Sequence, residues 1–441
     1  MPEKKPKPQP IYPESIPPEE KFGRPTVYRA PRGTSDILPQ EQVYWRYVEQ
    51  KVVNICQLYG YERLDVPTFE VTQLFARSVG KETDIVTKEM YTFADRGGKQ
   101  LTLRPELTAS VCRAYLEHGW HNLPQPVKLY SLASVFRYER PQAGRYREHH
   151  QFNYEAIGDA DPALDAEVID MSWQFYKSLN LQNLSLLLNS IGCKQCRPQY
   201  LAVLKDYYAR YTRDLCPDCK TRLKKNPLRL LDCKQPLCQQ IADSAPKSTQ
   251  HLCPECAEHF SQMKRYLGLL ELPFEVNHRL VRGLDYYTRT VFEVQTEEEG
   301  AQNTLGGGGR YDDLIEELGG KPTPGIGLAT GLERIILNLK KQNVPIPALP
   351  RPQVFIAYIG DEARNKAIEL AASLRRAGIA VIEAIGSKSL KAQLRQANTL
   401  GTRQAVIIGE EEVNTDTVIL RDMTSSEQQT VPMGQLEGIL R

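Results

Sequence analysis

The stretch L-V-R-G-L-D-Y-Y-T-R, residues 280–289, carries the most specific signal in this chain for both fold and chemistry. It sets Arg282 beside Asp285 and the paired residues Tyr286 and Tyr287. A guanidinium group binds phosphate and carboxylate oxygens through parallel hydrogen bonds, and the tyrosines add hydroxyl groups on rigid rings. The segment therefore predicts a site that holds an anion and a small polar ring together.

A second stretch, F-R-Y-E-R-P-Q-A-G-R-Y-R at residues 136–147, places four arginines within eleven positions around a proline and a glycine: Arg137, Arg140, Arg145 and Arg147. This pattern predicts an ordered turn directed at several phosphates. The flanking segments 128–138 and 151–157 are predicted to be strands of one antiparallel pair. Gln151, Asn153 and Glu155 would share one face, because strand side chains repeat every two residues. Such a row can face solvent or a ligand, and the adjacent arginine-rich loop favours the ligand.

Two further segments complete the predicted site. In P-G-I-G-L-A-T-G-L-E-R, residues 324–334, a strand of small residues leads into a helix, so the strand can approach a flat ligand while Arg334 reaches its polyphosphate end. In L-R-P-E-L-T, residues 103–108, Pro105 begins a helix and places Glu106 and Thr108 in its first turn. A carboxylate at a helix start is also explained by compensation of the helix dipole. The run G-G-G-G at 306–309 fits neither the dinucleotide nor the Walker pattern.

Length and composition indicate a folded protein of two to four domains, since 441 residues exceed one typical core and 41% hydrophobic with 25% charged residues is ordinary. No apolar run approaches the ~18 residues that span a bilayer, and the first residues lack the apolar part of a secretory signal. We therefore expect a cytoplasmic protein with no membrane contact. The 56 basic and 54 acidic residues nearly cancel, so contact with RNA has to come from local patches.

The cysteines are concentrated in one part of the chain. Eight of the ten form four close pairs: Cys193 and Cys196, Cys216 and Cys219, Cys233 and Cys238, Cys253 and Cys256. Two sulfurs three positions apart converge on one zinc ion, and a reducing compartment disfavours disulfides. We expect structural zinc, with Cys216, Cys219, Cys253 and Cys256 in one site and the other four in a second. A reduced thiol cluster or a metal-free remnant is the alternative.

Changes in composition divide the chain. Residues 1–26 are rich in proline and are expected to be disordered, and 27–340 form the main domain, interrupted by a cysteine-rich insertion at 190–272. A linker at 341–352 precedes a separate α/β domain at 353–441, for which alternating strand and helix patterns predict a mostly parallel sheet. A helix over 42–58 should end at Gly60, and a strand should follow over 61–68.

From about Arg32 to its end, the chain resembles bacterial histidyl-tRNA synthetases, which are class II enzymes. The resemblance rests on L-V-R-G-L-D-Y-Y, G-G-G-R-Y-D and the three class motifs, the first of which is the helix and strand at 42–68. It implies an α+β fold, an antiparallel sheet core flanked by helices plus a C-terminal α/β anticodon-binding domain. It also implies a homodimer, with the first motif in the interface. The same helix and strand could instead pack within one subunit.

The resemblance implies ligation of L-histidine to tRNA(His) with ATP and Mg²⁺ through a histidyl-adenylate. Glu106, Thr108 and Gln151 would hold the α-amino group of histidine. Glu155 and Tyr287 would bind its imidazole, and an imidazole-specific pair of this kind rejects apolar side chains strongly. Arg282 and Tyr286 complete the histidine site.

The arginines match the ATP contacts of the family. Arg137 would contact the α-phosphate, Arg334 the γ-phosphate and Arg145 the triphosphate. Arg282, opposite Arg137, would stabilise charge growing on the α-phosphoryl oxygens. Arg140 and Gln142, at the tip of the loop, would contact the acceptor end of the tRNA. Leu107 stands where the family often has glycine, and many members lack the cysteine pairs.

Two other assignments remain in view. A non-catalytic synthetase-like regulatory subunit of histidine biosynthesis would share the core, but such proteins lack the C-terminal domain and usually lose the arginines that this chain keeps. A class II synthetase for proline, threonine or glycine is disfavoured by L-V-R-G-L-D-Y-Y.

Overall fold

The computed structural model describes residues 27–80, 83, 85–140, 144–296 and 303–441. The predicted disorder of residues 1–26 and the predicted contact of Gln142 lie outside the described residues. The chain forms two compact units, residues 1–346 and 347–441, each with its own hydrophobic core. Among the helices described, every one is too short or too polar to cross a membrane.

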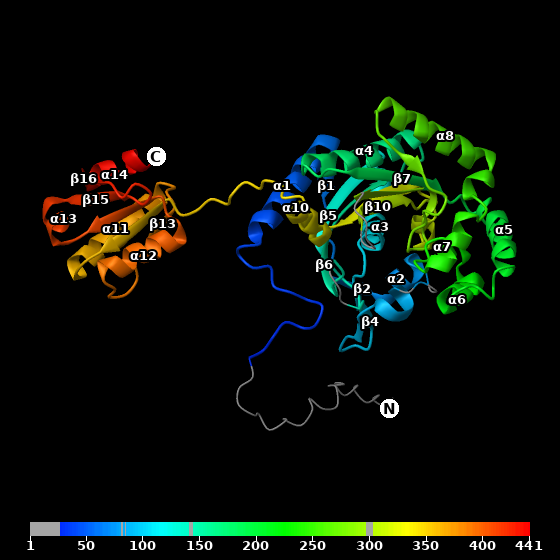
Figure 1. The fold of residues 1–441 in the computed structure, drawn as a ribbon, viewed down its shortest axis with the longest axis horizontal. Helices are drawn as coiled ribbons and strands as arrows, with labels where there is room; N and C mark the ends of the chain where they lie inside the picture. Colours follow the sequence, from blue (N-terminus) through cyan, green and yellow to red (C-terminus); the bar gives the residue numbers. More distant parts are fainter. Residues whose placement is uncertain (1–26, 81–82, 84, 141–143, 297–302) are drawn as a thin grey trace, which may run out of the picture. The chain divides into compact units, whose positions relative to one another are not determined.

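An eight-stranded sheet organises the first unit (Figure 1). Its strands, in spatial order, are β1 (Glu62–Arg63), β5 (Val127–Phe136), β6 (Glu148–Ile157), β11 (Gly325–Gly331), β10 (Thr304–Arg310), β9 (Thr288–Thr296), β7 (Leu184–Ser190) and β8 (Glu275–Val276). The six strands from β5 to β7 pair antiparallel, and each short edge strand pairs parallel with its neighbour. The expected α+β fold with an antiparallel core is confirmed.

Alternating side chains give the sheet an apolar layer on each face. On one face lie α1 (Gln42–Tyr59), α4 (Pro162–Ser178), α8 (Pro254–Leu269) and α10 (Leu332–Lys341), which share a core with Phe152, Tyr154 and Phe292 of the strands. Toward the other face lie α2 (Thr72–Ser78), α3 (Thr108–Glu117) and α9 (Leu314–Glu317), with the π-helical turn Ile85–Glu89 and the 3-10 turn Trp120–Asn122. The predicted end of α1 is confirmed, since Gly60 adopts the left-handed conformation with φ 74°.

The strand predicted over 61–68 is wrong in extent. Only β1 forms there, and β2 (Phe69–Val71) belongs to a separate three-stranded sheet with β4 (Gln100–Leu103) and β3 (Thr92–Ala94). Pro67 has no N–H for a ladder. The buried guanidinium of Arg104 instead donates to the carbonyl oxygens of Val66, at 2.6 Å, and Pro67, at 3.1 Å. The Arg104 side chain thus occupies backbone carbonyl oxygens that a longer strand would have used for hydrogen bonds to a neighbouring strand.

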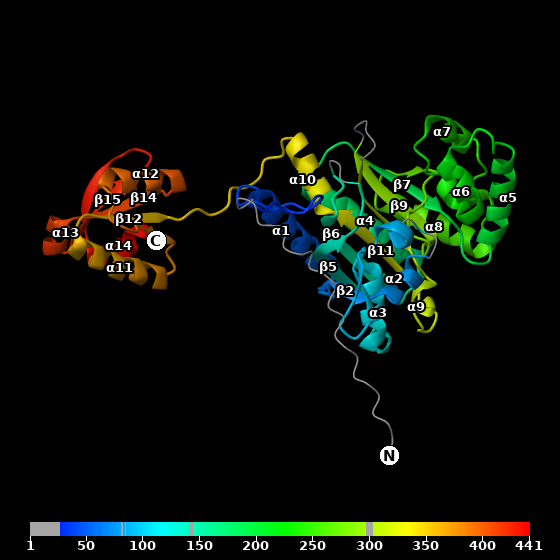
Figure 2. The ribbon, with the colours of Figure 1, turned by 90° about the horizontal axis from the view of Figure 1, so that it is seen from below.

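The cysteine-rich segment is helical. It contains α5 (Arg197–Ala209), α6 (Pro217–Lys225), α7 (Pro236–Asp243) and the 3-10 turns Pro227–Leu230 and Ser248–Gln250, and it returns through α8. Figure 2 shows α5, α6 and α7 gathered beyond the β7 side of the sheet. Helix α8 packs its Phe260, Met263 and Leu267 into the core beside α4. The segment is therefore anchored to the main sheet by its last helix.

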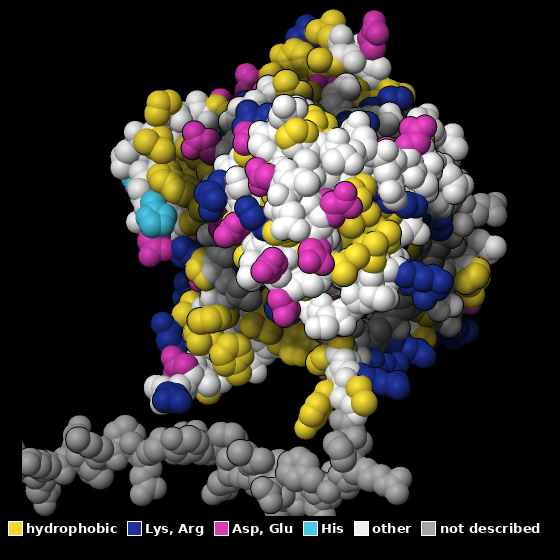
Figure 3. Space-filling model, turned by 90° about the vertical axis from the view of Figure 1, so that its left-hand side faces the viewer, with side chains coloured by type: hydrophobic (Ala, Val, Ile, Leu, Met, Phe, Trp, Pro, Cys, Tyr) yellow, Lys and Arg dark blue, Asp and Glu magenta, His cyan; other side chains and the backbone are white. Residues whose placement is uncertain are grey.

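The second unit contains a five-stranded sheet in the order β13 (Val381–Glu383), β12 (Val354–Tyr358), β14 (Gln404–Ile408), β15 (Thr417–Asp422), β16 (Gln428–Pro432). Its helices are α11 (Asp361–Arg376), α12 (Leu390–Leu400), α13 (Glu410–Thr415) and α14 (Leu436–Leu440), with a 3-10 turn at Met433–Gln435. The sheet is mixed rather than mostly parallel, because β15 and β16 form an antiparallel hairpin. The Asp422 carboxylate accepts the N–H groups of Thr424 and Ser425 and closes its turn. Figure 3 shows acidic and basic side chains both present on the visible surface, as the near balance of charge predicts.

Candidate active site

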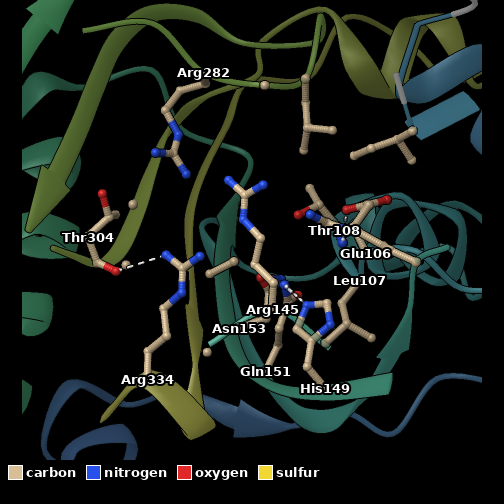
Figure 4. Close-up of a pocket in the computed structure, with 18 of the residues that line it drawn as sticks. Glu106, Leu107, Thr108, Arg145, His149, Gln151, Asn153, Arg282, Thr304 and Arg334 are labelled. Atoms are coloured by element: carbon tan, nitrogen blue, oxygen red, sulfur yellow. Dashed lines mark hydrogen bonds between the residues drawn. The ribbon is translucent and has the colours of Figure 1, made fainter. Parts of the chain in front are cut away.

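A pocket of about 230 Å³ lies where the four sequence stretches 103–108, 136–147, 280–289 and 324–334 meet. Its walls come from the start of α3, the ends of β5 and β6, the glycines of β10 and β11, and the segment before β9. In Figure 4, Arg282 and Arg334 lie on one side of the pocket, and Glu106 and Thr108 lie on the other. One side is therefore suited to anions and the other to a cationic or hydrogen-bond-donating group.

Four arginines line the pocket: Arg137, Arg145, Arg282 and Arg334. The Arg282 guanidinium donates to Glu293 through an ion pair of 2.7 Å and lies 6.0 Å from the centre of the Tyr287 ring. It sits directly over Gly307 of β10, where an added Cβ would come within 2.6 Å of the guanidinium. The unusual glycine run thus provides the space in which this arginine lies across the sheet.

The other three arginines are oriented by the loop and strand ends around them. Arg334 donates to the carbonyl oxygens of Thr304, at 3.0 Å, and Gly144, at 3.3 Å. Arg137 donates to the carbonyl of Pro105 at 2.8 Å, whereas the half-exposed Arg145 forms a 3.6 Å ion pair with Glu139. Backbone carbonyls orient Arg334 and Arg137 without neutralising them, so the charge of these two arginines stays available to a polyphosphate.

Glu106 is buried at the start of α3. Its carboxylate accepts the N–H groups of Thr108, at 2.7 Å, and Ala109, at 3.0 Å. This is the helix-start role that the sequence left open. Burial raises the pKa of Glu106, and the backbone donors together with nearby Arg137 oppose the shift. The carboxylate has acceptor capacity beyond these two bonds, because each ionised carboxylate offers about four lone-pair sites.

Gln151 carries an unfilled acceptor into the pocket. Among the described residues, its buried Oε1 atom has no hydrogen-bond partner, while Nε2 lies 3.4 Å from Nε2 of His149. A buried amide oxygen without a donor costs free energy, on the order of 1–3 kcal/mol. A ligand ammonium group bound here would satisfy it.

Glu155 lies one layer deeper and is absent from the described pocket lining. Its Oε1 accepts the hydroxyl of Thr108, at 2.6 Å, and the amide of Asn153, at 2.7 Å, and its Oε2 accepts the hydroxyl of Tyr311 at 2.6 Å. Burial raises the pKa of Glu155 to about 8, and the charge of Glu106 adds to the rise. When ionised, the carboxylate offers roughly four acceptor sites, of which three are used within the protein and one remains on Oε2.

Tyr286 and Tyr287 are neighbouring residues of the pocket lining. Their ring centres lie 4.7 Å apart, and each side chain is buried. Tyr286 also packs edge-on against Tyr311, with ring centres 5.9 Å apart. Burial raises the pKa of both phenols, so each keeps its hydroxyl proton as a hydrogen-bond donor at neutral pH.

The structure brings most of the predicted site residues together. Those on the lining are Arg137, Arg145, Arg282, Arg334, Glu106, Thr108, Gln151, Tyr286 and Tyr287. Glu155 supports the floor from beneath, as described above. Arg140 is exposed and lies outside the lining, and Gln142 falls outside the described residues.

His149 and Glu293 belong to the site but were not predicted from the sequence. Burial and the charges of Arg137 and Arg334 lower the pKa of His149 to about 3, so its ring is neutral at pH 7. The two-residue period of β6 places His149 on the face of Gln151, and starting the strand at Glu148 rather than Gln151 would have found it. Glu293 has no local signal, because only the fold puts it beside Arg282.

A second, larger hollow of about 810 Å³ adjoins the pocket and shares Arg145, Arg282 and Arg334 with it. Its outer wall comes from the cysteine-rich segment, through Arg229, Asp232, Lys234 and Gln239, and from Arg279. The hollow therefore extends the cationic side of the pocket toward the insertion.

The eight paired cysteines gather into two groups of four thiols, and within each group the sulfurs lie within 4.8 Å of one another. Cys193, Cys196, Cys253 and Cys256 flank the start and end of the insertion and are called the root cluster. Cys216, Cys219, Cys233 and Cys238 lie inside it and are called the inner cluster. The expected grouping of Cys216 and Cys219 with Cys253 and Cys256 is therefore wrong. The fold closes the insertion on itself, so that its first pair meets its last.

Both clusters have dimensions that suit a tetrahedral metal. A Zn–S bond of about 2.3 Å implies sulfurs roughly 3.8 Å apart. The sulfurs of Cys193 and Cys196 are 3.8 Å apart, those of Cys193 and Cys253 are 3.9 Å apart, and those of Cys216 and Cys233 are 3.8 Å apart. Four thiolates at these spacings leave no open coordination position, so the expected role of a bound ion is structural.

Comparisons with known proteins agree with this geometry. A family model described as histidyl-tRNA synthetase matches residues 33–195 and 223–335, and a model of an anticodon binding domain matches 353–441. The unmatched residues 196–222 contain α5 and the start of α6. The unmatched stretch lies within the cysteine-rich segment.

Individual relatives give the same result. A histidine–tRNA ligase from Dehalococcoides mccartyi is 60% identical over 410 residues, which cover 93% of this chain and 98% of that protein. The crystal structure of apo histidyl-tRNA synthetase from S. aureus superimposes with a TM-score of 0.80 at 35% identity, over 94% of this chain and all of that chain. A Bacillus halodurans structure described as an ATP phosphoribosyltransferase regulatory subunit/histidyl-tRNA synthetase has a TM-score of 0.63 at 21% identity, over 88% of this chain and 99% of that chain, and shares the fold.

Proposed function

Because the chain belongs to the histidyl-tRNA synthetase family, we propose that it joins L-histidine to tRNA(His) in two steps that use ATP. In the first, the histidine carboxylate attacks the α-phosphorus of ATP, which gives histidyl-adenylate and pyrophosphate. In the second, a hydroxyl group of the terminal adenosine of the tRNA attacks the histidyl carbonyl and AMP leaves. The observation that carries the proposal is the pocket with arginines on one side and unfilled acceptors on the other.

The acceptor side suits the amino acid. Gln151 Oε1, Glu106 and Thr108 would accept hydrogen bonds from the α-ammonium group of histidine. This group supplies the donor that Gln151 Oε1 lacks among the described residues. The remaining lone pair of Glu155 and the hydroxyl of Tyr287 would hold the two ring nitrogens of the imidazole. A side chain that leaves these buried groups unpaired would be rejected strongly, by a factor on the order of 10⁴.

The cationic side suits the triphosphate. Arg137 would contact the α-phosphate, Arg145 and Arg334 the outer phosphates, and Arg282 the oxygens on which charge grows during the attack. When bound, Mg²⁺ would neutralise part of the negative charge of the phosphates. It binds proteins through one or two carboxylates together with substrate phosphates, and Glu139 and Glu333 on the pocket lining offer such oxygens.

We infer three further properties from the family and the residue patterns. The second unit would contact the anticodon, and Arg140 with Gln142 would contact the acceptor end. The enzyme would act as a cytoplasmic homodimer. The two thiol clusters would each hold a structural zinc ion, since a small cysteine-rich segment gains much of its folding free energy from metal. The regulatory-subunit alternative lacks the anticodon-binding domain that this chain has.

Exchange of pyrophosphate into ATP tests the proposal directly. The full chain is assayed with each of the twenty amino acids, and exchange is expected with histidine alone at an appreciable rate. Comparable exchange with proline, threonine or glycine, or none with histidine from folded protein, would contradict the assignment. A charging assay with tRNA(His) then separates the enzyme from a non-catalytic paralogue.

A further inference from the structure

The root cluster is linked to the wall of the histidine site by one arginine. Arg197 follows Cys196 directly, and its backbone N–H donates to the carbonyl of Cys193 at 2.9 Å. Its guanidinium donates to the backbone carbonyl of Tyr287 at 2.6 Å and to that of Gly192 at 3.0 Å. The backbone at Tyr287 is thus bonded to the turn that carries the first cysteine pair.

Arg289, two residues after Tyr287, is held in a strained backbone conformation by the same turn. Arg289 has φ 48°, in the left-handed region, and the register between β9 and β10 shifts at this point. Its N–H donates to the carbonyl of Gly192 at 2.9 Å, and its carbonyl accepts the N–H of Ile191 at 2.8 Å. A non-glycine residue keeps such a conformation only when its surroundings impose it. Here the surroundings are the residues that lead into the root cluster.

The second cysteine pair reaches the same residue. Glu255, between Cys253 and Cys256, lies 3.9 Å from the Arg289 guanidinium, which also pairs with Asp312 at 3.5 Å. The thiol of Cys196 packs against the turn itself: Gly192 has φ 71°, and a Cβ at that position would come within 2.8 Å of the sulfur. Both pairs of the root cluster are therefore connected to the backbone that follows Tyr287, the first through Gly192 and Arg197 and the second through Glu255.

The segment of the inner cluster reaches the 280–289 stretch through different contacts, a shared apolar core and a side-chain hydrogen bond. It meets the other end of the 280–289 stretch, where the amide of Asn226 donates to the side chain of Asp285 at 2.6 Å. Through Asp232 and Lys234 it forms part of the outer wall of the larger hollow. The two clusters thus support different parts of the site.

We propose that the root cluster binds a zinc ion that positions the Tyr286–Tyr287 backbone for histidine, whereas zinc in the inner cluster supports the insertion and the outer wall of the larger hollow. The inference rests on the proposed function, because histidine is the ligand that reports it. Arg197 is a positioning residue, since it acts through the Tyr287 backbone and not on the substrate. Loss of the ion frees the Cys193–Arg197 turn, and the strained bulge at Arg289 relaxes with it.

The test compares three variants of the full chain purified without chelator. Wild-type protein is expected to hold two zinc ions by elemental analysis. Cys256→Ala and Cys238→Ala should each lose one. In Cys256→Ala, the Kd for histidine, measured by calorimetry, should rise about tenfold or more, because small displacements of positioning groups have effects of this size. The Kd for ATP should not change, and hydrogen exchange should increase in peptides covering 286–290.

Arg197→Met is the decisive variant, because it removes the guanidinium that bonds Tyr287 and keeps every thiol. It should retain two zinc ions and still show the weakened histidine binding, whereas Cys238→Ala should bind histidine as the wild type does. Unchanged histidine binding in Cys256→Ala despite zinc loss, equal weakening in Cys238→Ala, or wild-type protein free of zinc would each overturn the proposal. Absence of histidine-dependent exchange in wild-type protein with both ions bound would instead overturn the proposed function.

Discussion

Arg282 is the side chain on which we expect the first chemical step to depend most. It is held over Gly307 and paired with Glu293, so its charge is fixed before substrates arrive. Replacement by alanine should lower the single-turnover rate of adenylate formation by roughly a hundredfold, the usual effect of removing a fixed donor to a developing anion. The Kd for histidine should change much less.

Arg441→Ala is the matched control, because Arg441 is exposed, lies in the second unit and pairs with nearby Glu437. It should leave both the rate and the affinity unchanged. Adenylate formation at the wild-type rate in Arg282→Ala would show that another cation serves the α-phosphate.

Glu155 predicts a pH dependence of stability in the ligand-free protein. Its pKa is raised from 4.5 to about 8 by burial, so the folded state binds its proton more tightly than the unfolded state. This contribution is fully present below about pH 4.5 and is lost as the pH rises toward 8. Within that window the free energy of unfolding should fall by up to about 1.4 kcal/mol per pH unit on account of this group.

Glu155→Gln cannot titrate but keeps the shape of the side chain and hydrogen-bonding atoms toward Thr108, Asn153 and Tyr311. Urea unfolding of both proteins at pH 5.5 and 8 gives the comparison, in which all other titrating groups cancel. The wild type should lose more stability than the variant between the two values. Parallel loss in both would show that the buried carboxylate is ionised throughout.

At the scale of elements, strand β10 contains two glycines whose replacement should have different effects, one on activity and one on stability. A Cβ on Gly307 would meet the movable end of Arg282 at 2.6 Å, whereas a Cβ on Gly308 would meet the backbone oxygen of Gly327 at 1.9 Å. Gly307→Ala should therefore fold and form adenylate slowly. Gly308→Ala should lower the free energy of unfolding by about 1–3 kcal/mol, as overpacking does.

Gly268→Ala in α8 is the control, since no described residue outside its own helical turn comes within 4 Å of the added Cβ. Alanine is a better helix former than glycine, so this variant should be as stable as the wild type or slightly more so. Thermal unfolding and adenylate formation measured on all three proteins distinguish the cases. A Gly307→Ala enzyme with full activity would mean that Arg282 does not need its position over the strand.

Elements with strong local signals were predicted well from the sequence. The helix ending at Gly60 and the strand pair around the arginine-rich loop both form. Contacts between distant residues explain the failures. Arg104 ends the strand predicted over 61–68, and the pairing of cysteines depends on how α8 returns to α4, which spacing along the chain does not encode.

The site shows the same division between local and distant information. Arg282, Arg137 and Arg334 carry their own motifs and were predicted, whereas Glu293 becomes a partner of Arg282 only through the register of β9. The burial of Glu155 beneath the pocket lining could not be predicted either. The two-residue period of a strand shows which face a side chain is on, but not which other residues cover it. Motifs thus predicted which residues meet, and the fold decided which of them touch the pocket.

For the whole molecule, the boundary at residue 347 predicts a separation of tasks. Every described residue of the pocket, and both thiol clusters, lie before it, and the second unit has its own core around β12 and β14. A chain ending at Leu349 should therefore fold and form histidyl-adenylate at the wild-type rate. Its charging of tRNA(His) should fall by about tenfold or more, since each 1.4 kcal/mol of lost binding is a factor of ten.

Pyrophosphate exchange and charging measured on the same preparation give both rates. Because the two assays share the first chemical step, equal loss in both would place part of the catalytic support in the second unit, and unchanged charging would show that tRNA recognition lies entirely in the first.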